Sequence, residues 1–173
     1  MRSSARTVIG ASLFFLIAPG TVAGWIPYAL TRWRIQPPLL GWSAVRVVGG
    51  LVVALGAAGL IECFRRFVTE GRGTPAPIAP PEKLVVSGLY RHVRNPMYVA
   101  VVVAIVGQAL FFGAIQLLGY AVAVWLAFHA FVVLYEEPKL RQMFGGEYDA
   151  YRANVPRWWP RATSWDRVKN GRR

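Results

Sequence analysis

Residues 97–134 contain no Asp, Glu, Lys or Arg, and this apolar run is the feature that most constrains the fold. As one continuous helix it would reach about 60 Å at 1.5 Å per residue, about twice the hydrocarbon thickness of a bilayer. We therefore expect the run to fold back near Gly113 as a helical hairpin, with helices over about 96–112 and 114–135.

The rest of the chain is too apolar for an ordinary soluble domain. It is 55% hydrophobic and only 16% charged, with a mean hydropathy of +0.37. Residues 8–30 and 42–64 are further segments long enough to span a bilayer. We expect residues 1–173 to form a single all-α, polytopic membrane domain with about four transmembrane helices.

The N-terminal span has an alternative interpretation. Arg2 and Arg6 precede an apolar core that is followed by Thr21, Val22 and Ala23, as in a secretory signal peptide. Because the apolar stretch is long and continues past these small residues, we favour a membrane anchor.

The distribution of basic residues predicts an orientation. Most of the 20 Lys and Arg residues lie in the N-terminal tail, in the loop 65–95 or in the C-terminal segment 136–173, whereas the loop between the first two spans holds only Arg32 and Arg34. The positive-inside tendency therefore places both termini and the 65–95 loop in the cytosol, and in the inner or plasma membrane if the chain is bacterial.

Several classes of function are disfavoured. The net charge of +12 is spread along the flanks of the spans, which indicates attraction to anionic lipid and argues against nucleic-acid binding. The lone Cys63, and His92 and His129 in segments of different type, predict no metal site. No obligate protein partner is evident.

Two polar clusters flank the apolar run, one over residues 88–98 and the other over 136–139. Lipid supplies no hydrogen-bond partners, so such groups must satisfy one another or a ligand. A hairpin returns both clusters to the same, cytosolic, face. We therefore expect them to line a site there.

The C-terminal segment carries shorter helical patterns. Leu140, Met143 and Phe144 share one face of an amphipathic helix at the membrane interface, and Tyr148 and Tyr151 lie one turn apart on a second short helix. Trp158 and Trp159 suit the membrane interface, and we expect residues 161–173 to be frayed and lipid-facing.

Four motifs around the hairpin give the chain a specific resemblance. They are Leu84-Val85-x-x-Gly88-x-Tyr90, Arg94-Asn95-Pro96-x-Tyr98, Glu136-Glu137-x-x-Leu140 and Phe144-Gly145-x-x-Tyr148-x-x-Tyr151-x-x-x-Val155-Pro156. In this order and spacing the chain resembles the integral membrane methyltransferases of the isoprenylcysteine carboxyl methyltransferase and phospholipid methyltransferase family. The likeness covers about half of the chain.

The resemblance implies a methyltransferase that takes S-adenosylmethionine as methyl donor at the cytosolic membrane face. The family's cofactor positions fall on Lys83, Leu84, Val85, Tyr90, Asn95, Pro96, Met97, Tyr98 and Glu136.

The chemistry of these residues agrees with that implication. Asn95 precedes Pro96, which fits the first turn of a helix, where anions such as the cofactor's carboxylate are favoured. Glu136 can accept hydrogen bonds from ribose hydroxyls or an ammonium group. Tyr90 and Tyr98 offer faces for the sulfonium, although Tyr98 can equally be a packing residue of the hairpin.

The acceptor is left open. Glu137 or Arg91 is a candidate to position or deprotonate it. Eukaryotic prenylcysteine enzymes typically have an arginine before the acidic pair and a histidine before the proline, whereas this chain has the apolar residues 131–135 and Asn95. These departures favour a lipophilic amine, thiol or hydroxyl acceptor over a prenylcysteine carboxylate. The remaining alternatives are a phospholipid N-methyltransferase, a thiol S-methyltransferase, or a non-catalytic protein that binds lipid or a partner.

Overall fold

The computed structural model describes residues 17–71 and 83–165, and these residues are helical with no strand, which confirms an all-α chain. Parts of the predicted first span, cytosolic loop and tail fall on residues 1–16, 72–82 and 166–173, outside the described residues. The elements are η1 (Thr21–Trp25), α2 (Ile26–Thr31), α3 (Ala44–Arg66), η2 (Phe67–Gly71), η3 (Gly88–Arg91), α4 (Pro96–Phe112), α5 (Gln116–Phe131), η4 (Val132–Glu136), α6 (Glu137–Phe144) and α7 (Gly146–Asn154).

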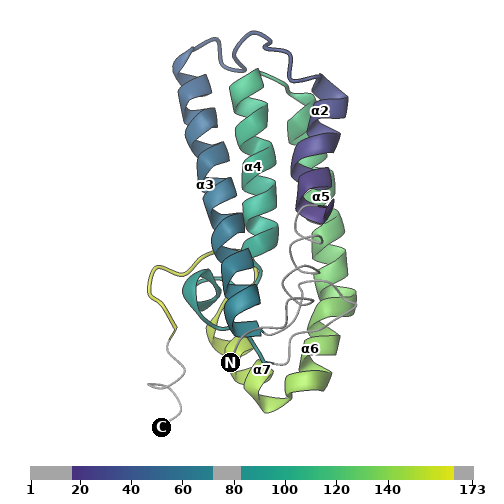
Figure 1. The fold of residues 1–173 in the computed structure, drawn as a ribbon, viewed down its shortest axis with the longest axis vertical. Coiled ribbons are helices and arrows are strands. Elements are labelled where there is room, and N and C mark those ends of the chain that lie inside the picture. The colour runs from purple at the N-terminus through teal and green to yellow at the C-terminus, as the bar shows by residue number, and fades with distance from the viewer. Residues whose placement is uncertain (1–16, 72–82, 166–173) are drawn as a thin grey trace.

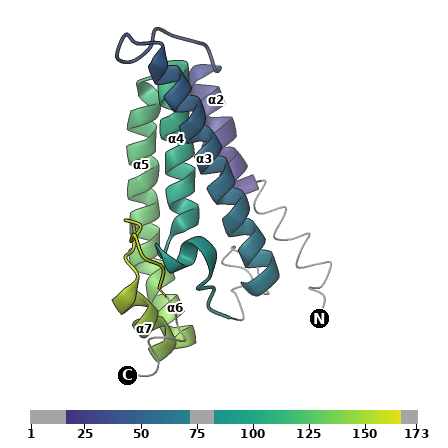
Figure 2. The same ribbon diagram turned by 90° about the vertical axis from the view of Figure 1, so that its left-hand side faces the viewer.

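The predicted hairpin is present. Helix α4 ends at Phe112, and Gly113 follows with a φ of +70°, a left-handed conformation that glycine adopts without strain. Gly113 is also pressed against the carbonyl oxygen of Pro37, so a side chain there would collide with the backbone. The chain then turns back into α5, and α4 lies between α3 and α5 (Figures 1 and 2).

Helices α3 and α4 approach so closely that their glycines touch the opposite backbone. A Cβ atom on Gly56 would lie 2.8 Å from the amide nitrogen of Ala104, and one on Gly107 would lie 2.6 Å from that of Val53. Small residues allow the two helices to come this close. In lipid the hydrophobic effect does not drive helices together, so close packing through small residues contributes much of the energy of association. The fold therefore depends on where glycine falls in each helix.

Two helices of the described residues are long and apolar enough to cross a membrane, α3 and the continuous helix over residues 116–144. Only 22% of the apolar stretch of each is buried inside the protein, unlike the core helix of a soluble domain. Helix α4 is apolar but shorter, and the first predicted span is described only from Ile17 onward. The number of four spans therefore stays a prediction.

Two π-helical turns, η1 and η4, have the same origin in the sequence. Each is followed two residues later by a proline, Pro27 or Pro138. Proline has no N–H for the carbonyl four residues earlier and its ring collides with that carbonyl. The wider turn relieves the collision, and the residue before each proline donates instead to the carbonyl five residues back, Ile26 to Thr21 and Glu137 to Val132.

Two side chains of the hairpin donate hydrogen bonds to backbone carbonyl oxygens of the first π-helical turn, η1. The Gln108 Nε2 on α4 donates to the Ala23 oxygen at 2.7 Å, and the Tyr120 hydroxyl on α5 donates to the Val22 oxygen at 2.9 Å. In a bilayer an unpaired carbonyl is costly, so these bonds allow the proline-containing helix to pack against the hairpin.

Replacing Gln108 with methionine is expected to lower stability by about 1 kcal/mol, the usual size of one interhelical side-chain bond in a membrane. Methionine keeps the length of the side chain but donates nothing to Ala23. Gln116→Met is the matched control, because Gln116 is exposed at the start of α5. Thermal unfolding in detergent measures the difference, and equal midpoints for the two variants would contradict the role of Gln108.

Candidate active site

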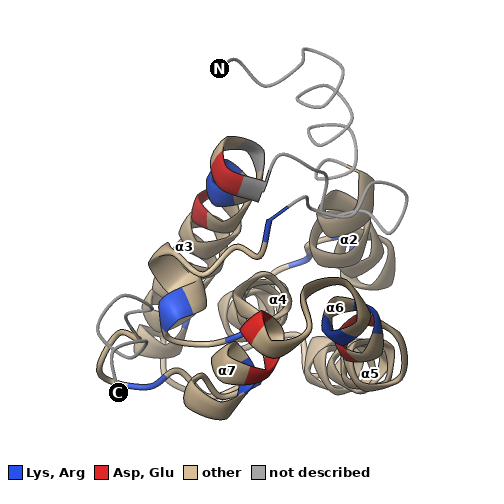
Figure 3. Cartoon of the chain, turned by 90° about the horizontal axis from the view of Figure 1, so that it is seen from below, with Lys and Arg blue, Asp and Glu red and all other residues tan. Residues whose placement is uncertain are grey.

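Most charged residues of the described ranges gather at one end of the helix bundle, which Figure 3 shows from below; Arg32, Arg34 and Arg46 lie at the opposite end, near the loop between α2 and α3. At the charged end α3 finishes, η3 leads into α4, and α5 continues through η4 into α6 and α7. The hairpin therefore brings the two polar clusters of the sequence to the same end of the molecule, as expected.

Glu137 lies at the centre of a buried ion-pair cluster. Its Oε1 lies 3.0 Å from Arg94 Nη1 and 2.6 Å from Arg157 Nε, and its Oε2 accepts from Arg157 Nη2 at 2.9 Å. The side chains of Arg94 and Glu137 are only 8% and 10% exposed. Arg94 also donates to the Tyr148 hydroxyl at 3.1 Å. Because both carboxylate oxygens are engaged, Glu137 ties α6 to the start of α4.

The neighbouring Glu136 belongs to a different contact. The Tyr98 hydroxyl donates to Glu136 Oε2 at 2.7 Å, and the Tyr98 ring packs on Phe128 with ring centroids 4.6 Å apart. Tyr98 thus packs within the hairpin and also contacts Glu136, and its role in cofactor binding stays a prediction. Glu136 ends the η4 turn and Glu137 begins α6, so the two consecutive carboxylates serve different partners.

A C-terminal strap, residues 155–165, lies along the Arg91–Asn95 stretch in the opposite direction. The backbone N–H of Arg94 donates to the Pro156 oxygen, that of Arg161 to the His92 oxygen, and that of Trp165 to the Arg91 oxygen. The Asn95 side chain donates to the Arg157 oxygen at 3.2 Å. These bonds hold the start of α4, and with it Asn95, in one position.

Aromatic residues anchor the strap and the η3 turn. The Tyr151 hydroxyl donates to the Tyr90 oxygen at 2.7 Å, and Trp165 is buried in a cluster with Tyr148, Tyr151 and Val155. The strap also contacts α5, where the Trp158 indole N–H donates to His129 Nδ1 at 3.1 Å.

Burial and hydrogen bonding shift the pKa values of several of these groups. Burial raises the pKa of the Tyr90, Tyr148 and Tyr151 hydroxyls, so all three stay neutral donors at physiological pH. The hydrogen bond to Glu137 raises the pKa of Arg157, which keeps its charge and its ion pair over the working range of pH.

The predicted cofactor residues lie in two neighbouring groups that meet at Met97, which packs against the cluster of Cys63, Val85 and Tyr90. Asn95, Pro96, Met97, Tyr98 and Glu136 lie at the start of α4 and on η4. Lys83 is exposed, and Leu84, Val85 and Tyr90 pack under the strap and against α3, with Tyr90 and Val85 beside Cys63.

The two residues predicted to act on the acceptor lie apart. Glu137 is enclosed by the two arginines, whereas Arg91 donates from Nε to the Trp165 oxygen at 2.7 Å and faces a separate hollow on the other side of η3.

The expectation for the tail was wrong over residues 161–165. Arg161 and Trp165 are hydrogen-bonded to the η3 turn and the residue after it, and Trp165 is 5% exposed.

The amphipathic helix predicted around Leu140 is present as α6, but Leu140 and Phe144 pack on the Tyr148 and Tyr151 cluster. Periodicity cannot distinguish a lipid-facing apolar side from one covered by another segment of the chain.

Arg157 is the site residue that the sequence pattern missed. Its position directly after Val155-Pro156, within the motif region, was the available signal. Its aromatic neighbours Trp158 and Trp159 instead indicated a membrane anchor.

Comparisons with known proteins relate the chain to membrane-lipid and prenylcysteine methyltransferases. The family model of phospholipid methyltransferases matches residues 44–147, which run from the first residue of α3 into α7. Protein-S-isoprenylcysteine O-methyltransferase B of Arabidopsis thaliana is 39% identical over 75 residues, 43% of this chain and 38% of that protein. A probable protein-S-isoprenylcysteine O-methyltransferase of Oryza sativa subsp. japonica is 31% identical over 133 residues, 73% of this chain and 66% of that protein. The chain thus matches between about two fifths and two thirds of the length of these relatives.

Proposed function

The chain belongs to the phospholipid methyltransferase family, and we propose that it transfers a methyl group from S-adenosylmethionine to a lipophilic acceptor at the cytosolic membrane face. The observation that carries this proposal is the pair of neighbouring polar contacts at one end of an apolar hairpin. Tyr98 holds Glu136, and Arg94 with Arg157 holds Glu137, beside a hairpin that the family model covers.

The residues at the start of α4 suit the methyl donor. Bound S-adenosylmethionine would supply the electrophilic methyl group of its sulfonium. Glu136 is half-buried and receives one hydrogen bond from Tyr98, and the carboxylate has acceptor capacity for a cofactor ammonium or ribose hydroxyl. Methyl transfer needs alignment and exclusion of water more than acid–base chemistry, and a site fixed by a strap provides alignment.

Glu137 is proposed as a positioning residue. Its two arginine partners stabilise the ionised form, and its carboxylate joins α6, the strap and the start of α4. Because both of its oxygens are engaged, positioning suits Glu137 better than proton abstraction. Arg91 holds the strap through Trp165, and we assign it the same kind of role.

Two acceptor classes are supported by different observations. The apolar residues 131–135 favour a neutral amine, thiol or hydroxyl on a lipid. The names of the curated relatives favour a prenylcysteine carboxylate. A panel of prenylcysteines, phospholipid amines, thiols and isoprenoid alcohols, assayed with labelled donor, decides between them.

A binding titration tests the function itself. Purified protein in detergent is titrated with S-adenosylmethionine and S-adenosylhomocysteine, and binding in the micromolar range is expected. A non-catalytic lipid-binding protein would bind neither. Absence of binding up to about millimolar concentration would overturn the proposal.

Replacing Glu136 with alanine is expected to weaken S-adenosylmethionine binding about ten- to a hundredfold. That corresponds to about 1.5–3 kcal/mol for one lost charge-assisted hydrogen bond. Trp159→Ala, at a side chain that is 84% exposed, is the control and should leave affinity unchanged. Equal affinity in Glu136→Ala and the parent protein would remove Glu136 from the site.

The orientation in the membrane is a further prediction. Single cysteines introduced at Arg72, Lys169 and Arg34 in a Cys63→Ser background should label from the cytosol, the cytosol and the opposite side, respectively. Arg34 is exposed in the loop after α2, whereas the nearby Thr31 is buried and unsuited to labelling. Labelling of positions 34 and 72 from the same side would contradict an odd number of crossings between them.

A further inference from the structure

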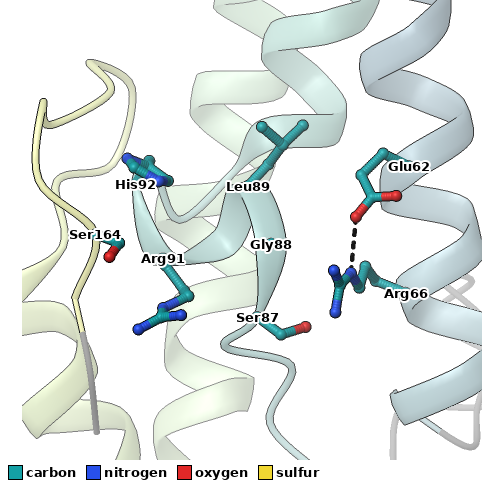
Figure 4. A pocket seen from close by; sticks show the side chains of 8 residues that line it. All are labelled: Glu62, Arg66, Ser87, Gly88, Leu89, Arg91, His92 and Ser164. Atoms are coloured by element: carbon teal, nitrogen blue, oxygen red, sulfur yellow. Dashed lines mark hydrogen bonds and ion pairs between the residues drawn. The ribbon is translucent and has the colours of Figure 1, made fainter.

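A hollow of about 480 Å³ lies at the charged end of the bundle, on the side of η3 that faces α3. Its walls come from three parts of the chain: the end of α3, the η3 turn and the strap. Figure 4 shows the side chains that line it.

Hydrogen-bond donors reach this hollow from all three walls. Arg66 comes from α3, Arg91 and His92 from η3 and the residue after it, and Ser164 from the strap. Arg91 Nε and His92 Nδ1 contact the backbone oxygens of Trp165 and Arg161, so these two residues have only their other nitrogens for a ligand. Glu62 is the one carboxylate in the described lining, and it is shared between Arg65 and Arg66 at 2.9 and 2.7 Å. The lining therefore suits an anion with several oxygen acceptors.

Contacts between α3 and the segment around η3 hold two walls of the hollow together. Arg66 bonds both Glu62 and Glu70, and Ser87 donates to Glu70, which joins α3 to the segment before η3. Gly88 has a φ of +54°, and a Cβ atom there would lie 3.0 Å from Arg66 Nε. Glycine thus allows the η3 backbone to approach the Glu62–Arg66 ion pair of α3. This close approach forms one side of the hollow.

The surroundings indicate where the anion comes from. The hollow adjoins the last turn of α3, a helix whose apolar stretch is mostly exposed, including Leu55 and Ile61 at 69% and 61% exposure. In a bilayer, acyl chains would lie along these residues and the headgroup phosphates would lie level with the helix end. Leu89, 37% exposed, gives the hollow an apolar edge toward the chains.

We propose that this hollow binds the phosphate of an anionic phospholipid whose acyl chains lie along α3. The site is separate from the Tyr98–Glu136 contact and does not depend on methyl transfer. Guanidinium groups and hydroxyls recognise the phosphate oxygens, and the exposed face of α3 accommodates the tails.

Lipid binding to the full-length protein in detergent tests the proposal, with native mass spectrometry to count bound molecules. Dioleoyl phosphatidylglycerol should bind at least about tenfold more tightly than dioleoyl phosphatidylcholine, the gain expected from charge-assisted bonds to an anionic headgroup. Glycerol phosphate, which has the same headgroup chemistry without tails, should not compete at equal concentration.

Two variants locate the site and one controls for charge. Arg91→Gln removes a donor from the lining, and Ser164→Phe fills the hollow without a change of charge; each should weaken phosphatidylglycerol binding about tenfold. Arg141→Gln removes the same charge from the same end of the bundle, but Arg141 is 58% exposed, pairs with Asp149 and lies outside the lining, so its effect should stay below about twofold.

Three results would overturn the proposal. Equal binding of the two lipids would exclude recognition of the anionic headgroup. An equal loss in Arg141→Gln and Arg91→Gln, with none in Ser164→Phe, would indicate general attraction to a basic surface. Competition by glycerol phosphate at the same concentration as the lipid would indicate a site for a soluble phosphate.

Discussion

Replacing Gly56 with leucine is expected to abolish the folded protein. A Cβ atom at Gly56 would lie 2.8 Å from the Ala104 nitrogen and 2.9 Å from the Ala100 oxygen, and both are backbone atoms that cannot rotate away. A larger side chain would force α3 and α4 apart along their contact. Overpacking a core costs about 1–3 kcal/mol where side chains can adjust, and here they cannot, so a larger loss is expected.

Size-exclusion chromatography in detergent measures this effect as the yield of monodisperse protein. Gly119→Leu is the matched control, because Gly119 is exposed on α5 and a Cβ atom there would have no other atom within 4 Å. This variant should be obtained in normal yield. A normal yield of Gly56→Leu would show that α3 and α4 do not pack backbone to backbone.

Replacing Glu137 with alanine is the second change with a large expected effect, a loss of about 3–5 kcal/mol in the free energy of unfolding. It leaves Arg94 and Arg157 without their shared carboxylate, and the Arg94 side chain is 8% exposed. Removing one partner of a buried ion pair costs this much because the remaining charge stays buried and uncompensated. The strap should also loosen, since Arg157 lies on it.

Chemical denaturation measures the stability, and proteolysis after residue 154 measures the loosening of the strap. Asp149→Asn is the control, because the Arg141–Asp149 pair is exposed on both sides and should contribute less than about 1 kcal/mol. If Glu137→Ala is no less stable than Asp149→Asn, the cluster around Glu137 is not a structural element.

Much of the site followed from local sequence. Asn95 before Pro96 predicted where α4 begins, because proline suits the first turn of a helix and disfavours a helical residue before it. Glu136 and Glu137 were predicted to return to the same end as the 88–98 cluster, because an uncharged run about twice the bilayer thickness has to fold back.

The partners of these residues did not follow from local sequence. Arg157 contacts Glu137 across 20 positions of the chain, and Trp165 contacts Arg91 across 74. Arginines and tryptophans near a membrane segment have the same pattern whether they anchor in the interface or pack on the protein. Only the path of the strap distinguishes the two.

The sequence by itself determined the class of the fold, the hairpin and the end of the bundle where the polar groups meet. These depend on hydrophobic length, proline and glycine positions and the distribution of charge, each of which acts on a few neighbouring residues. Only the tertiary structure decided that Glu137 pairs with two arginines, that Gly56 touches the backbone of α4, and that Arg91 faces a hollow beside α3. Such contacts join residues distant along the chain, and their energies depend on a separation of a few ångströms that no local pattern specifies.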